Sequence, residues 1–171
     1  GQGGDEGLAG YQPYPQFFYT CLRQKQYLTL LAEIGAMVRH GQVNLAATGL
    51  QSLALHLPAS WVAPYWQKRH QQQVDLTVLN PTFAAQSQKQ ALVDTGAFFA
   101  YRHLGQHLKY LIEVASLPDI LRHVDRNAMA FGVEARIPFL DYRLVEFSLN
   151  QALPWAIHQG WTKWVLRRAM Q

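Results

Sequence analysis

The sequence lacks several features that mark large classes of protein. It has one cysteine, Cys21, which excludes an internal disulfide and fits a reducing cytosol. No apolar run approaches the roughly 18 residues of a membrane span and no secretory signal is visible, so we expect a cytoplasmic protein that does not contact membranes. Basic residues outnumber acidic ones only 15 to 11 and lie scattered, without the basic stripe and interleaved aromatic residues that a nucleic-acid surface requires.

Apolar residues, in contrast, are plentiful. They make up 49% of the 171 residues, against 15% charged, which is enough to bury a core as one domain. The chain shows no internal repeat and no clear linker. Helical spacing of apolar residues predicts helices before residue 116 at 14–40, at 45–56 with Asn44 as a cap, from Asn80-Pro81 to about Val93, and at 96–115.

Three residues with chemical potential lie in these helices, and we assign none of them a role. Cys21 follows Phe17 and Phe18 in an apolar pattern, so it is expected in the core rather than as a nucleophile. His103 and His107 are four residues apart, the spacing of a metal pair, but no Asp, Glu or Cys nearby completes a ligand set. We therefore expect the two histidines on a solvated helix face.

The stretch from Leu117 to Asp141 has the most definite pattern. Ser116 is a candidate N-cap, Pro118 fits the first helical turn, and Gly132 can end the helix in a left-handed conformation. The period then changes to two, and Asp141 is placed to cap the next helix. A buried stripe is predicted along the first helix, formed by Ile120, Leu121, Val124, Ala128 and Phe131.

Two charges lie within the extended part of this stretch. Glu134 and Arg136 are two residues apart, so they share a face of an extended chain. Charges in an apolar segment are costly unless they are paired or bound to something. We predict a structural ion pair, a buried brace that holds the turn; contact with a ligand is the alternative.

The first eleven residues are dense in glycine. Glycines let backbone N–H groups converge on an anion, but Asp5 and Glu6 would repel a bare phosphate. A Mg²⁺ ion that bridges a carboxylate and phosphate oxygens would resolve this conflict. The alternative is a flexible glycine turn.

A lysine stands at an unfavourable place near the C-terminus. Thr162 is predicted to cap the last helix, which puts Lys163 in its first turn, where the helix dipole disfavours a positive charge. An anion bound there would explain this placement, because helix N-termini and lysine both favour phosphate. A solvent-exposed lysine without a ligand is the alternative.

Three stretches in order resemble the glutamine-hydrolysing asparagine synthetase family. The family's second nucleotide motif is similar to the first eleven residues, Gly1-Gln-Gly-Gly-Asp-Glu-Gly-Leu-Ala-Gly-Tyr11. A motif of the family's synthetase domain is similar to Asp-Arg-x-x-Met-Ala followed by Val-Glu-Ala-Arg-Ile-Pro-Phe-Leu-Asp141. The family's C-terminal lysine motif is similar to Gly160-Trp-Thr-Lys-Trp-Val-Leu-Arg-Arg-Ala169. The segment from about Tyr14 to Ala115 carries no diagnostic residues.

The resemblance implies a fold that is mainly α in this chain. Residues 1–171 would be the helical C-terminal portion of an α/β adenine-nucleotide α-hydrolase-like domain, a PP-loop ATP pyrophosphatase. The parallel sheet, the first phosphate loop and a glutaminase domain would lie upstream, so we interpret the chain as a fragment that is inactive alone. A homodimer is compatible with this interpretation.

The resemblance also implies a carbon–nitrogen ligase that uses ATP and Mg²⁺. ATP would activate a small carboxylate, by default that of aspartate, as an acyl-adenylate. Ammonia released from glutamine by the N-terminal domain would then form asparagine. The residues that match the family's motifs are Lys163 and Arg126 for the α-phosphate and pyrophosphate, Gly1, Gln2, Gly3 and Gly4 for the nucleotide, and Asp5 for Mg²⁺.

One residue departs from the family's pattern. Gln2 stands where well-studied members carry a glutamate, and a glutamine amide cannot act as a general base at neutral pH. This keeps open an enzyme that amidates another carboxylate or closes a ring. A degenerate scaffold without catalysis is the alternative outside the enzyme class.

Overall fold

A computed structural model describes residues 2–41, 43–58, 60–62, 64, 101–151 and 153–171. This part of the chain is mainly helical, as predicted, and none of its helices is long and apolar enough to cross a membrane. The predicted helix from Asn80-Pro81 to Val93 lies outside the described residues. The α-helices are α1 (Gly4–Gly7), α2 (Tyr14–Arg23), α3 (Tyr27–His40), α4 (Leu45–Ala54), α8 (Leu104–Tyr110), α9 (Leu117–Met129), α10 (Tyr142–Leu149), α11 (Leu153–Ala156) and α12 (Trp164–Ala169).

Short irregular elements join these helices. A π-helical turn, η1 (Leu111–Ala115), connects α8 to α9, and a 3-10 turn, η2 (Pro138–Leu140), precedes α10. The strands β1 (Ile157–His158) and β2 (Trp161–Thr162) form a two-stranded antiparallel hairpin that leads into α12.

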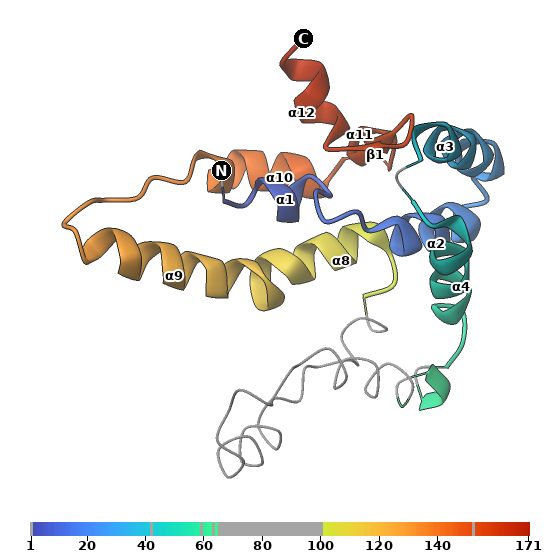
Figure 1. Cartoon of the computed structure of the whole chain (residues 1–171), viewed down its shortest axis with the longest axis horizontal. Coiled ribbons are helices and arrows are strands. Elements are labelled where there is room, and N and C mark those ends of the chain that lie inside the picture. The colour runs from blue at the N-terminus through green and yellow to red at the C-terminus, as the bar shows by residue number, and fades with distance from the viewer. Residues whose placement is uncertain (1, 42, 59, 63, 65–100, 152) are drawn as a thin grey trace.

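The helices are arranged around the short helix α1. Figure 1 shows α8, η1 and α9 running on as one long helical arm, with α10 on the opposite side of α1. Helix α1 contacts α8, η1 and α10, whereas α2 contacts α3, α4 and α8 at the other end of the molecule. The glycine-rich first motif therefore lies between two layers of helices.

The segment predicted as one helix at 14–40 is two helices. Helix α2 ends because Lys25 adopts a left-handed conformation with φ of +57°. The N–H of Gln26 then donates to the carbonyl of Cys21 at 2.9 Å, and that of Lys25 donates to Leu22 at 3.2 Å, which is the Schellman arrangement. Glycine usually occupies this position, so a lysine gave no sequence signal for the break.

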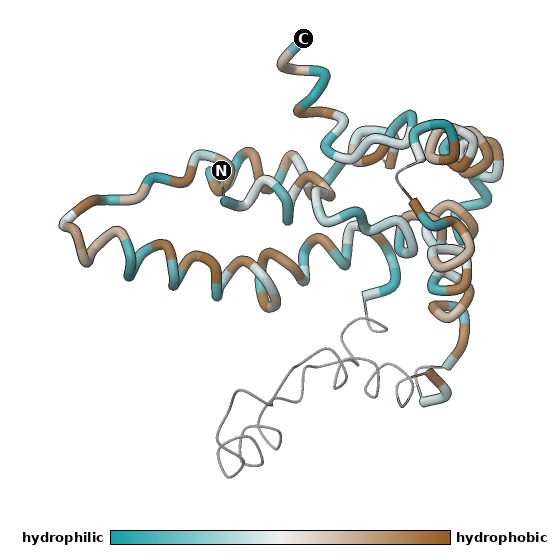
Figure 2. Tube along the Cα trace, viewed as in Figure 1, coloured by the Kyte–Doolittle hydropathy of each residue, from teal (hydrophilic) through white to brown (hydrophobic). Residues whose placement is uncertain are grey.

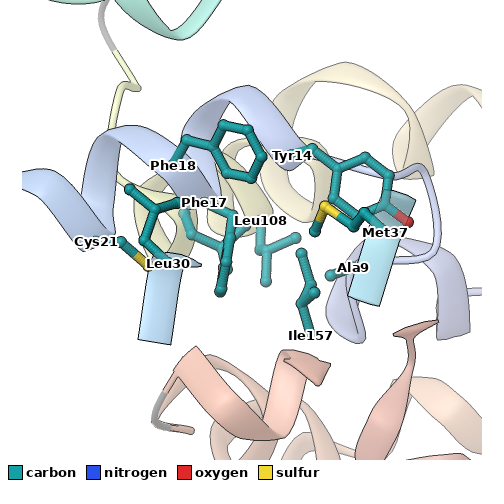
Figure 3. Packing of buried hydrophobic residues seen from close by; sticks show 10 residues of the cluster. Ala9, Tyr14, Phe17, Phe18, Cys21, Leu30, Met37, Leu108 and Ile157 are labelled. Atoms are coloured by element: carbon teal, nitrogen blue, oxygen red, sulfur yellow. The ribbon is translucent and has the colours of Figure 1, made fainter. Parts of the chain in front are cut away.

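The main core lies between α2, α3, α8 and β1. Figure 3 shows Phe17, Phe18 and Cys21 of α2 in one buried cluster with Leu30 of α3, Leu108 of α8 and Ile157 of β1. Cys21 is fully buried, and this burial raises the pKa of its thiol to about 11. The prediction that Cys21 belongs to the core is confirmed.

Helix α9 differs from its predicted environment. It ends at Met129 and is followed, as expected, by a turn with a left-handed Gly132 at φ of +66°, but the side chain of Ser116 does not cap its start. Figure 2 shows alternating hydrophobic and hydrophilic positions along the arm, yet only Leu117 of α9 is buried and Phe131 is 85% exposed. Ile120, Leu121, Val124 and Ala128 are half-buried on the predicted face, so the stripe lies on the expected side of the helix but is only partly covered.

The predicted pair of Glu134 and Arg136 forms, but it is not buried. Their side chains approach to 3.1 Å while remaining 72% and 82% exposed. They lie in the extended segment that connects the tip of the arm to the turn before α10 (Figure 1). A pair this exposed stabilises a fold by about 0–1 kcal/mol, so the interpretation as a buried brace is wrong.

Other predicted helix starts are confirmed. The Asn44 side chain accepts a hydrogen bond from the N–H of Ala47 at 3.0 Å, and Asp141 accepts one from Arg143 at 3.0 Å. The Arg143 side chain also hydrogen-bonds to Asp141 and lowers the pKa of that carboxyl to about 2.

The two histidines of the 96–115 segment lie in different surroundings. The His103 ring packs edge-on against Tyr19 at 5.3 Å, and His103 and His107 are both half-buried, so the predicted solvated face is wrong for this pair. The described residues contain no group of three metal-ligating side chains. Burial lowers the pKa of His107 to about 4, so the imidazole is neutral in the folded protein at neutral pH.

This burial makes stability depend on pH. The His107 pKa falls from 6.5 to about 4 on folding, so between these values the unfolded chain binds the extra proton. We expect the free energy of unfolding to fall by on the order of 2 kcal/mol as pH drops from 6.5 to 4. Urea titrations at several pH values measure this change. His107→Gln should flatten the slope; an unchanged slope would show that other groups cause it.

Candidate functional site

The first motif and the 137–141 motif meet at α1. Gly3 has φ of +88°, and a Cβ there would lie 2.8 Å from Cγ of Leu140. A Cβ on Gly4 would lie 3.5 Å from the ring of Phe139. The absence of a side chain at Gly3 lets Leu140 pack directly on the backbone at the start of α1, whereas a Cβ at Gly4 would make only ordinary contact with Phe139.

Close packing accounts for further glycines of the motif. A Cβ on Gly7 would lie 3.1 Å from the hydroxyl of Ser148 on α10. Gly3, Gly4 and Gly7 are buried, and residues 4–7 are helical, so the flexible glycine turn is wrong. Gln2 is exposed at the start of this motif, and Gly1 lies outside the described residues. Nucleotide binding by Gly1, Gln2, Gly3 and Gly4 stays a prediction.

Lys163 lies against the same motif. Its ammonium is 2.7 Å from a carboxylate oxygen of Asp5, and its backbone N–H donates to the carbonyl of Leu8 at 3.1 Å. The two side chains are 30% and 41% exposed, so a ligand can reach them from solvent. The structure thus brings together two residues predicted for the site from opposite ends of the chain.

The local conformation at Lys163 differs from the prediction. Thr162 belongs to β2 rather than to a helix cap, and Lys163 itself occupies the N-cap position of α12 with φ of +55°. Pairing of Ile157 with Thr162 holds the chain extended for one residue longer than the helical pattern indicated. The Lys163 side chain therefore leaves from a sharp strand-to-helix turn.

Gly10 packs closely against both Asp5 and Lys163. A Cβ there would overlap the Asp5 carboxylate and would lie 2.5 Å from Cε of Lys163. The N–H of Gly10 donates to the carbonyl of Asp5 at 2.7 Å, which keeps the two residues close. Only a residue without a side chain leaves room for the Asp5–Lys163 pair.

The pair has suitable chemistry for a metal-bound phosphate. Mg²⁺ is usually held by one or two carboxylates together with phosphate oxygens and water, and Asp5 supplies one such carboxylate. A cation on Asp5 would compete with the Lys163 ammonium and release it for a phosphate oxygen. Asp5 therefore fits as one ligand of a Mg²⁺ ion that arrives with its phosphates.

Arg126 is not part of this cluster. It lies in the last turn of α9 with an exposed side chain. Figure 1 shows that end of α9 at the tip of the arm, away from the start of α12. Among the described residues, the site consists of Asp5 and Lys163, with Arg126 separate from them.

Sequence reasoning missed the role of Glu6. Its carboxylate is 1% exposed and accepts hydrogen bonds from Tyr11 at 3.0 Å and from Ser116 at 3.1 Å. The Ser116 hydrogen bond acts to lower the pKa of Tyr11, but burial and the Glu6 charge outweigh it and raise that pKa. Glu6 therefore anchors α1 to the start of α9, a contact over 110 residues that no local pattern could indicate.

Comparisons with known proteins identify the family of this chain. Over 68 residues the chain is 35% identical to asparagine synthetase (glutamine-hydrolyzing) 3 of Bacillus subtilis (strain 168), a stretch that covers 39% of this chain and 11% of that protein. No solved structure matches the chain. The model of the family described as asparagine synthase matches residues 1–171, the whole chain. The chain therefore belongs to the asparagine synthase family.

Proposed function

We propose that this chain is part of an ATP-dependent ligase that makes asparagine from aspartate. The observation that carries the proposal is the contact of Asp5 with Lys163 at 2.7 Å, at the point where the family's glycine motif and lysine motif meet. The named relative is a glutamine-hydrolyzing asparagine synthetase, which supports glutamine as the source of ammonia. That ammonia would come from a glutaminase domain elsewhere in the intact protein.

The reaction consists of two displacements. An oxygen of the aspartate side-chain carboxylate attacks the α-phosphorus of ATP, and the bond from that phosphorus to pyrophosphate breaks. Ammonia then attacks the acyl carbon of the adenylate, and the carbon–oxygen bond to AMP breaks. The nitrogen loses a proton, which the departing AMP phosphate can accept, so asparagine, AMP and pyrophosphate are formed.

Lys163 has the charge that the first displacement requires. Negative charge grows on the pyrophosphate as it leaves, and an ammonium held beside it stabilises that transition state more than the ground state. Asp5 would hold Mg²⁺ when ATP binds, and the Mg²⁺ would neutralise phosphate charge. Arg126 remains the second candidate for phosphate contact, through its exposed guanidinium on the arm.

The remaining parts of the proposal concern the intact protein. The helices described here would complete an α/β PP-loop domain whose sheet and first phosphate loop lie elsewhere in the protein. We place the enzyme in the cytosol, where ATP is available and where the unpaired Cys21 stays reduced.

Gln2 favours one alternative acceptor class. It is exposed at the edge of α1, and its amide cannot take a proton from an attacking amine. A related enzyme that amidates another small carboxylate, or closes a ring, would use the same Asp5–Lys163 pair with a different acceptor pocket. A non-catalytic scaffold would retain the packing of α1 without adenylation.

The acceptor can be tested directly with the intact protein. Given ATP, Mg²⁺, an ammonium salt and aspartate, we expect asparagine and AMP in equal amounts, because each adenylate is converted to one amide. Amino-acid analysis and nucleotide chromatography measure both products. AMP without asparagine would mean that water attacks the adenylate, and no aspartate-dependent AMP from protein that binds ATP would indicate a different acceptor.

A second prediction concerns the charge of Lys163. Lys163→Met in the intact protein should lower the rate of pyrophosphate release by about 10²-fold, which corresponds to about 3 kcal/mol of transition-state stabilisation. The melting temperature should change little, because the Asp5–Lys163 pair is partly exposed. Lys109→Met, at an exposed lysine of α8, is the matched control. Near-normal pyrophosphate release in Lys163→Met would contradict the assignment.

A third prediction concerns the space at Gly10. Gly10→Ala should reduce pyrophosphate release at least tenfold, because the new methyl group would overlap the Asp5 carboxylate and push it from Lys163. Gly49→Ala is the control, since a Cβ at Gly49 meets nothing within 4 Å. Steady-state pyrophosphate assays compare the two variants. Equal activity in both would show that the pair does not depend on this close approach.

A further inference from the structure

A buried carboxylate on α3 binds the turn that leads into Lys163. Glu33 is 3% exposed, and its two oxygens accept hydrogen bonds from the backbone N–H groups of Gln159 at 3.0 Å and Gly160 at 2.8 Å. The imidazole of His158 lies 3.4 Å from the same carboxylate. Three successive residues of the hairpin therefore converge on one side chain.

The geometry of this turn explains why it needs a carboxylate. Gln159 and Gly160 both have positive φ, at +52° and +77°, as in the two-residue turns that close tight hairpins. Both N–H groups point at Glu33, and a buried N–H without an acceptor is costly. A carboxylate offers two acceptor oxygens, whereas a glutamine amide offers one and turns an N–H₂ group toward the other donor.

The hairpin also packs closely against the backbone of α3. A Cβ on Gly160 would lie 3.1 Å from the backbone nitrogen of Met37, and the Tyr14 hydroxyl donates to the Gly160 carbonyl at 3.2 Å. The Trp161 ring contacts both the His40 ring and the Arg167 guanidinium, each at 4.8 Å. These contacts leave the turn little freedom to move.

Lys163 follows the turn by only three residues. The strand β2 lies extended between the turn and Lys163, so the position of the turn against α3 fixes the position of Lys163. It thereby determines where the Lys163 backbone hydrogen-bonds to Leu8 and where its ammonium contacts Asp5. We propose that Glu33 is a positioning residue for Lys163, acting through the hairpin without contacting the substrate. This inference rests on the proposed function only for its effect on rate, because the placement of Lys163 can be measured without catalysis.

The sequence contains one signal for this role, a charged residue among the buried positions of α3. Glu33 lies on the same stripe of α3 as Leu30 and Met37, at i, i+3 and i+7, and all three are buried. A charge on a buried stripe needs a partner. Its partners are backbone groups 126 and 127 residues away, which only the folded chain brings near.

The placement is tested by the reactivity of the Lys163 amine. The intact protein and its Glu33→Gln variant are treated with an acetylating reagent, and modification of Lys163 is followed by mass spectrometry against Lys109 as internal reference. We expect several-fold faster acetylation of Lys163 in Glu33→Gln, because the released hairpin separates the amine from Asp5. Glu146→Gln, at an exposed carboxylate of α10, should leave the ratio unchanged. An unchanged ratio in Glu33→Gln overturns the proposal.

A second variant covers the case in which Glu33→Gln does not fold. Gly160→Ala keeps the carboxylate but disfavours φ of +77° and crowds the α3 backbone, so it should move the turn from the other side. It should raise the relative acetylation of Lys163 in the same direction. Unchanged reactivity in a folded Gly160→Ala variant also counts against the proposal.

A double-mutant cycle then tests whether Glu33 acts on rate through Lys163. Pyrophosphate release should fall about tenfold or more in Glu33→Gln, but adding Glu33→Gln to Lys163→Met should cause no further loss. A further loss in the Lys163→Met background would show that Glu33 acts by another route and overturns the proposal. If the unaltered protein forms no AMP with aspartate, the proposed function fails while the acetylation result still decides the role of Glu33.

Discussion

The backbone of α1 can be approached closely because it lacks side chains on the surfaces where other elements meet it. Leu140 and Phe139 lie on Gly3 and Gly4, Ser148 lies on Gly7, and the Asp5–Lys163 pair fits beside Gly10. Phe139 and Leu140 belong to η2, Ser148 to α10, and Lys163 to the start of α12, so the short glycine-rich segment brings the family's motifs together between the helical arm and α10 (Figure 1). A methyl group at Gly3, Gly7 or Gly10 would press against residues of other elements, whereas one at Gly4 would make only ordinary contact with Phe139.

Charged groups in the described structure divide into those that hold the fold and those open to ligands. Glu6 and Glu33 are buried and receive hydrogen bonds from Tyr11 and Ser116, and from the hairpin backbone, respectively. These interactions satisfy buried carboxylates without a bound ligand. The pair of Asp5 and Lys163 is only partly covered, so both ions remain accessible from solvent.

Much of the fold and part of the site could be predicted from local pattern. The caps at Asn44 and Asp141, the left-handed Gly132 and the core position of Cys21 depend on neighbours in sequence, and all are confirmed. The break at Lys25 could not be predicted, because the residue that usually signals such an ending is glycine. The exposure of Glu134 and Arg136 was missed because the spacing of residues indicates which of them share a face but not whether another element covers it.

The sequence by itself determined the mainly helical character of the chain, the family resemblance and the choice of Asp5, Lys163 and Arg126 as candidates, because motifs and periodicity are local properties of the chain. Only the tertiary structure decided that Asp5 and Lys163 form a pair while Arg126 lies on the arm. It alone revealed that Glu33 holds the turn before Lys163. These outcomes depend on contacts between residues more than a hundred positions apart, and such contacts follow from the packing of whole elements rather than from the spacing of residues within one.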